Sequence, residues 1–195
     1  MQFAHDTEPS LLMAADLANS DYDGDERIGT LAALKDYLKA HEFTGWSSAE
    51  AADLEPVHGL RADLARVWAA PNPAAVAGIV NEMLEASPQQ PRLTRHGKWD
   101  WHLHFTPDDA PIPVRMRAEF AMALVDLVRS DNVDRLKVCA ADDCERVLVD
   151  LSRNRSRRFC AEGNCGNRTH VAAYRERRAT GSADAPRPSR TRRLP

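Results

Sequence analysis

The 195-residue chain lacks any run of about eighteen apolar residues, and it therefore lacks a candidate membrane-spanning helix. Its first ten residues contain neither the basic segment nor the apolar segment of a secretory signal peptide. A Ser-His-Asp order, a P-loop and a glycine-rich phosphate-binding loop are also missing. These absences predict a cytoplasmic protein that has no membrane partner and is not an enzyme.

Cysteine is absent from the first 138 residues, so all four cysteines lie in the last third of the chain. They form two pairs, with four residues inside each pair and fifteen residues between the pairs. In a cytosolic protein such clustering predicts a metal site before it predicts disulfides. Four thiolates fill the tetrahedral shell of zinc, whereas a catalytic zinc keeps one position open for water. We therefore predict a structural Zn²⁺ ion held by Cys139, Cys144, Cys160 and Cys165.

Charges of both signs are abundant, but they are divided unequally along the chain. Residues 135–195 contain 15 lysines and arginines and 7 acidic residues, whereas residues 1–134 contain 11 basic and 22 acidic residues. Such a bipolar chain predicts two parts with different tasks. The basic part suits a polyanion such as nucleic acid, which the acidic part would repel.

Apolar residues recur at helical spacing through most of the acidic part. This spacing predicts helices over residues 8–19, 30–42, 47–56, 57–70, 74–86 and 114–130. Residues 92–105 alternate instead between apolar and polar side chains, which indicates a half-buried hairpin with its turn at residues 96–97. We expect Trp99 and Trp101 on the core face of this hairpin, and His102 and His104 on its solvent face.

The predicted fold class is α+β: a mainly helical N-terminal domain with one β-hairpin, followed by a small treble-clef-like four-cysteine zinc finger. In the finger, residues 145–150 alternate like a strand and residues 167–178 have helical character. The predicted boundaries are 1–134 for the N-terminal domain with its hairpin near 92–105, 135–180 for the finger, and 181–195 for a disordered basic tail.

Arginine dominates the basic residues around the cysteines, since Lys137 is the only lysine after residue 134. A guanidinium group can grip phosphate or a guanine edge with two parallel hydrogen bonds, which lysine cannot do. The residues expected to contact nucleic acid are Arg153, Asn154, Arg155, Arg157, Arg158, Asn167, Arg168, Arg175 and Arg178. The alternative is a solvated basic surface, or internal ion pairs with Asp142, Asp143, Asp150 and Glu162.

The segments "VDLSRNRSRRFC" (149–160), "CGNR" (165–168) and "YRERR" (174–178) resemble the CGNR zinc finger family. "LLMAADLANS" (11–20) is similar to the opening of the helical ABATE domain that precedes this finger in such proteins. The resemblance covers about residues 8–178. It implies a bacterial, stress-related transcription regulator whose zinc finger binds duplex DNA.

The residues themselves leave two other functions open. Zinc fingers also bind RNA, often by stacking bases on aromatic side chains, and the finger offers Phe159 and Tyr174. Alternatively, the N-terminal domain binds a small-molecule effector, as a sensor, and the zinc is purely structural. The candidate ligand residues are Asp16, Asn19, His102 and His104. Because one small finger rarely supplies enough affinity for DNA, a homodimer is also expected.

Overall fold

The computed structural model describes residues 6–87, 90–95 and 100–179. The described residues form six α-helices: α1 (Thr7–Ala18), α2 (Leu31–Ala40), α3 (Leu54–Ala69), α4 (Pro73–Glu85), α5 (Ile112–Arg129) and α6 (Cys165–Ala179). They also form three antiparallel two-stranded hairpins: β1 (Asp21–Tyr22) with β2 (Asp25–Glu26), β3 (Arg92–Thr94) with β4 (His102–His104), and β5 (Leu136–Val138) with β6 (Val147–Val149). The architecture confirms the predicted α+β class, and β1–β2 is a hairpin that the sequence pattern had not indicated.

Local sequence signals explain where the helices begin. Thr30 caps α2, since its hydroxyl accepts a hydrogen bond from the amide of Ala33, and Asn72 caps α4 in the same way. The predicted segment 47–56 is not one helix but two 3₁₀ turns, Trp46–Ser48 and Ala51–Asp53, followed directly by α3. The extended backbone of Ala49 separates the two turns, so one continuous helix cannot form there.

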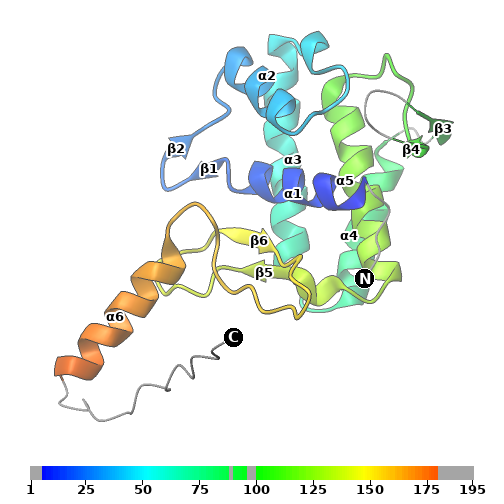
Figure 1. Cartoon of the computed structure of the whole chain (residues 1–195). Helices are drawn as coiled ribbons and strands as arrows, with labels where there is room; N and C mark the ends of the chain where they lie inside the picture. Colours follow the sequence, from blue (N-terminus) through cyan, green and yellow to red (C-terminus); the bar gives the residue numbers. More distant parts are fainter. Residues whose placement is uncertain (1–5, 88–89, 96–99, 180–195) are drawn as a thin grey trace, which may run out of the picture.

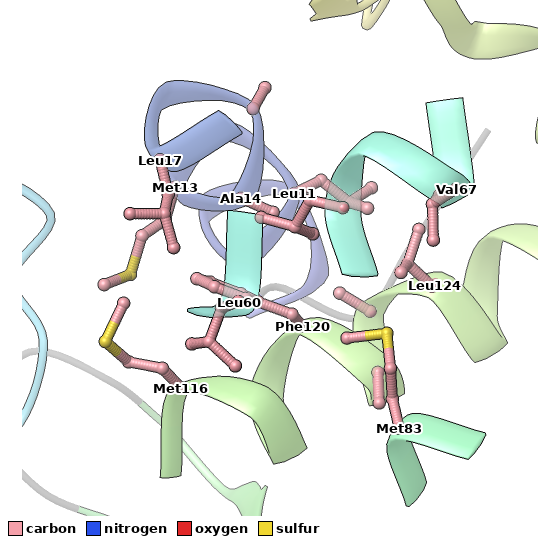
Figure 2. Packing of buried hydrophobic residues seen from close by; sticks show 14 of the residues in the cluster. Leu11, Met13, Ala14, Leu17, Leu60, Val67, Met83, Met116, Phe120 and Leu124 are labelled. Carbon is pink, nitrogen blue, oxygen red and sulfur yellow. The ribbon is translucent and has the colours of Figure 1, made fainter. Parts of the chain in front are cut away.

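The core lies where α1, α3, α4 and α5 meet. Figure 2 shows side chains from these helices forming one cluster, with Phe120 and Leu60 facing α1. On the two longest helices, residues at the helical spacing that predicted them are fully buried: Leu60, Leu64 and Val67 on α3, and Met116, Phe120, Leu124 and Leu127 on α5. Each such side chain contributes about 1.5–3 kcal/mol through burial. Helical periodicity therefore identified the central residues of the core correctly.

The β3–β4 hairpin is present, but the predicted assignment of its two faces is wrong. Trp101 is 57% exposed and Leu103 is 42% exposed, whereas the His104 side chain is only 14% exposed. Alternation reveals that a strand has two unlike faces, but not which face meets the neighbouring helices. Here the histidine face is held inward: the Nε2 atoms of His102 and His104 lie 3.2 Å apart, and His104 Nδ1 lies 3.4 Å from Asp108. The predicted turn at 96–97 and Trp99 lie outside the described residues.

The C-terminal part follows directly from the helical core. After a 3₁₀ turn at Val133–Arg135, β5 and β6 pair with Leu136 opposite Val149, and α6 begins at Cys165. Val149 joins the main core, whereas Leu148 on the other face joins a second small cluster with the cysteines. In Figure 1, β6 lies beside α1, and α6 projects away from the rest of the described chain. The predicted tail, 181–195, lies outside the described residues.

Candidate metal centre and basic surface

The four cysteines come together from three separate places in the finger. Cys139 follows β5 and Cys144 precedes β6, so the hairpin supplies one pair from a single loop. Cys160 lies in the loop after β6, and Cys165 is the first residue of α6. All four side chains are buried and none is in a disulfide. The loop between β5 and β6 and the N-terminus of α6 therefore bring the cysteines together, as their spacing predicted.

The geometry of the sulfurs suits one metal ion. All four Sγ atoms lie within 4.8 Å of one another, with 3.8 Å between Cys144 and Cys160 and 3.5 Å between Cys160 and Cys165. A tetrahedron of sulfurs about 2.3 Å from a metal ion has edges of about 3.8 Å. The donor set is therefore one that a tetrahedral thiolate-binding metal fits, and no fifth ligand position is needed.

Hydrogen-bond donors to the sulfurs favour the thiolate form, whereas burial favours the neutral thiol. The amide of Cys160 donates to Cys139 Sγ over 3.4 Å, and Arg168 Nη2 donates to Cys165 Sγ over 3.3 Å. Burial raises the pKa of the Cys144 thiol, but the backbone N–H of Arg146 and the neighbouring thiols bring it down to about 7. Burial raises the pKa of Cys160 to about 12, so a bound metal must displace this proton.

Two small residues let the backbone approach the cluster. A Cβ atom on Gly163 would lie 2.8 Å from Cys165 Sγ, which leaves no room for any other residue at this position. Gly166, the second residue of α6, lies against the ring of Phe159. The turn is made by Asn164, whose φ is +49°.

Some arginine side chains around the metal centre make hydrogen bonds or ion pairs within the chain, and others make none with the described residues. Arg155 pairs with Asp134 at 2.7 Å and Arg168 pairs with Asp143 at 2.9 Å, and Arg157 donates to the carbonyl of Phe159. The internal pairing weighed as an alternative is therefore present for Arg168. Arg153 and Arg175 are exposed and make no hydrogen bond or ion pair with any described residue.

The other predicted nucleic-acid residues lie on the same two segments. Arg158 is exposed, and its guanidinium lies 5.8 Å from the ring of Phe159. Arg178 lies over the ring of Tyr174 on α6. Asn154 is exposed in the loop, and Asn167 donates to the side chain of Asn164 at the start of the helix. We define the basic surface as six exposed residues: Arg153, Asn154, Arg158, Arg168, Arg175 and Arg178.

Comparison with known families follows the same division of the chain. A family model described as "CGNR zinc finger" matches residues 135–178. A second model, ABATE, described as "Putative stress-induced transcription regulator", matches residues 12–131, which is more than half of the chain. The chain belongs to the ABATE family. A search of curated proteins found no match, and no helix in the described part of this ABATE protein is long and apolar enough to cross a membrane.

Asp150 is a central residue of the finger that sequence reasoning treated only as a partner for arginines. Its carboxylate is fully buried and receives hydrogen bonds from Lys137 Nζ and the Arg157 amide on one oxygen, and from Ser152 on the other. Burial raises its pKa, but Lys137 and Ser152 outweigh this and hold it at about 2. The spacing Asp-x-Ser, typical of an Asx turn, is the signal that could have identified it.

The ABATE core, by which we mean α1 to α5 with their connecting segments, and the finger are joined by specific contacts. The side-chain amide of Asn19, at the end of α1, donates to the carbonyl of Val147 and accepts from its N–H, both over 2.9 Å. Trp68 Nε1 on α3 donates to the carbonyl of Leu148. Asn19, predicted as a ligand residue, thus acts here as an extra partner for the edge of β6. The boundary predicted at residue 134 stays a prediction.

Asp16 and the two histidines, the other predicted ligand residues, do not share one site. Asp16 pairs with His41 at 2.9 Å and with Arg27 at 3.0 Å. The His41 hydrogen bond, opposed in part by burial, lowers the pKa of Asp16. His102 and His104 instead line a cavity against α1 and α5. On α5 this cavity is lined by Glu119, a residue that sequence reasoning missed.

Glu119→Gln is expected to stabilise the protein above neutral pH. Burial raises the pKa of Glu119 from 4.5 to about 7, because the folded chain favours the neutral carboxyl. The contribution of this neutral form to the free energy of unfolding is fully present below pH 4.5 and is lost as the pH rises through about 7. The full shift corresponds to about 3 kcal/mol, and because the carboxyl lines a cavity that water can enter we expect about 1–2 kcal/mol. Urea unfolding at pH 5.5 and pH 8 measures the difference between variant and wild type.

The exposed Glu85, at the end of α4, provides the matched control for this substitution. Histidines and thiols that titrate in the same range affect wild type and variant equally, so they cancel in the difference. Glu85→Gln should leave the pH dependence unchanged. Parallel stability curves for Glu119→Gln and wild type would contradict the burial of this charge.

Proposed function

We propose that this chain is a DNA-binding transcription regulator whose finger is held together by one structural Zn²⁺ ion. The observation that carries the proposal is four converging buried thiols directly beside an arginine-rich exposed loop and helix. Zinc is favoured because four thiolates in a tetrahedron are its usual structural ligand set. Since such a shell leaves no position for water or substrate, we expect no catalysis at the metal.

Rigid presentation of the basic surface supports a role in DNA contact. Asp150 ties the loop after β6 to Lys137 and to the amides of Ser152 and Arg157, and the carbonyl of Arg158 accepts from the amide of Ala140. Side chains on a fixed loop lose less entropy on binding phosphate than side chains on a mobile one. The exposed side chains of Arg153 and Arg158 therefore project from a loop that hydrogen bonds hold in one shape.

The ABATE core is proposed as the sensing part of this regulator. Asn19 couples the end of α1 to β6, so a ligand that shifts α1 would also shift the finger. The acidic charge of residues 1–134 favours an arrangement in which only the finger touches DNA. A homodimer would double the number of phosphate contacts and supply the affinity that one small finger lacks.

Replacing Arg153 and Arg158 together with glutamine is expected to weaken DNA binding about tenfold or more near 0.1 M salt. Each lost phosphate contact should also lower the slope of log affinity against log salt by about one. The measurement is fluorescence anisotropy of the zinc-loaded full chain with a labelled duplex over a salt titration. The control replaces two positive charges elsewhere, Lys35 on α2 and Arg92 on β3, with glutamine.

If the slope of log affinity against log salt is unchanged in the Arg153 and Arg158 variant, the loop is not part of the DNA interface. An equal loss in the Lys35 and Arg92 control would show that only net charge matters.

RNA binding is the second candidate, because Tyr174 is 54% exposed on α6 with Arg178 beside it, a pair on which a base could stack. Competition between duplex DNA and single-stranded RNA distinguishes the two polymers.

A further inference from the structure

The cavity beside α1 has the size of a small-molecule site. Its volume is about 360 Å³, and it lies between the first half of α1, the segment 41–44, the β3–β4 hairpin and α5. Cavities of a few hundred Å³ are typical of sites for small organic ligands. None of the residues that line the cavity belongs to the finger.

The walls of the cavity are largely apolar. The apolar side chains come from every element that surrounds it: Met13, Phe43, Leu103, Phe105 and Met122. On α5 the lining residues are Glu119, Met122, Ala123, Asp126 and Arg129, which lie on one face of the helix because the last four follow Glu119 by three, four, seven and ten residues. A ligand with an apolar body can therefore replace water along most of this surface.

Carboxyl groups outnumber the permanently cationic groups of the cavity. Four carboxyl groups line it, from Asp6, Glu42, Glu119 and Asp126, against one arginine, Arg129; three histidines, His41, His102 and His104, line it as well. Asp126 already accepts a 2.6 Å hydrogen bond from Thr7. Glu119 differs, because it makes no hydrogen bond or ion pair with any residue in the described part of the chain. A carboxyl group in an apolar cavity without a partner is destabilised, and a cation brought by a ligand would relieve this.

We propose that this cavity binds a small organic cation, with its ammonium group against Glu119 and its apolar body against Met13, Phe43 and Met122. The inference deepens the proposed sensing role, since it names the site and the class of ligand. α1 supplies the connection: Thr7, Ser10 and Met13 line the cavity, and Asn19 at the other end of the same helix holds β6 of the finger.

The test uses the full chain and three probes of one shape: 1-naphthylmethylamine, 1-naphthoate and 1-naphthalenemethanol. In calorimetry we expect the amine to bind at least about tenfold more tightly than the alcohol and the carboxylate, because only the amine forms a charged pair with Glu119. In Glu119→Gln the affinity for the amine should fall about tenfold, to that of the alcohol. Glu85→Gln, which removes an exposed carboxylate, should bind the amine as wild type does.

The location is checked with methyl-labelled methionine. The amine should shift the resonances of Met13 and Met122, which line the cavity, and leave that of the core residue Met83 in place. Equal binding of the three probes, preference for the carboxylate, or an unchanged amine affinity in Glu119→Gln would overturn the proposal. All of these measurements are made without DNA, so a failure of the proposed DNA binding would leave their outcome readable on its own.

Discussion

Replacing Cys165 with serine is expected to abolish stoichiometric metal binding and to unfold the finger, while α1 to α5 stay folded. Among the residues that the structure describes, the second buried cluster contains only Ala141 and Leu148 besides the four cysteines, with Phe159 packed against it. Val149 packs on the main core, but the segment 152–179 has only this small cluster to pack on. So few apolar side chains cannot offset the entropy of ordering that segment, whereas zinc sites of this type contribute about 10–16 kcal/mol of apparent binding energy. Metal analysis and backbone amide NMR spectra of the two proteins measure the effect.

Chelation of the wild-type protein provides the control for this substitution. A strong chelator should reproduce the spectrum of Cys165→Ser, with the amide signals of α6 collapsing toward unfolded positions. The same chelator should leave the variant unchanged, since it has no metal to lose. If α6 keeps its dispersed signals after the metal has been removed, then packing, rather than the metal, holds the finger together.

The metal centre could be predicted from the sequence because its signal is local. The spacing groups the four cysteines into two close pairs, and the structure places all four sulfurs within 4.8 Å of one another. The helices are similar, because periodicity over three or four turns marks a buried stripe without knowledge of its partner. Leu60 and Phe120, both fully buried, were identified in this way.

Features that depend on distant partners could not be predicted in the same way. The faces of the β3–β4 hairpin were interchanged, because the neighbours of His102 and Trp101 are decided by helices elsewhere in the chain. Asn19 and Val147 are 128 residues apart, and nothing near either one indicates their double hydrogen bond. Glu119 lies between apolar positions of α5, and only the folded chain shows that it lines a cavity.

Asp150→Ala is expected to weaken DNA binding although it removes a negative charge. The Asp150 carboxylate accepts from Lys137 at 2.6 Å and from the amides of Ser152 and Arg157 at 2.9 Å each. Alanine leaves these donors without their partner, at a cost of about 3 kcal/mol to the free energy of unfolding of the finger. The pKa of about 2, against 3.8 ordinarily, corresponds to about 2 kcal/mol and agrees with this size.

The direction of the change in DNA affinity separates two explanations of the basic surface. If net charge alone attracts DNA, then removing either Asp150 or the exposed Asp142 should tighten binding slightly. If the loop must be held in shape, Asp150→Ala should bind DNA about tenfold more weakly, while Asp142→Ala binds as well as wild type or better. Anisotropy titrations of both variants in the zinc-loaded state, with chemical unfolding in parallel, decide between them. Tighter binding by Asp150→Ala would show that the arginines act through their charge and that the fixed loop is not needed.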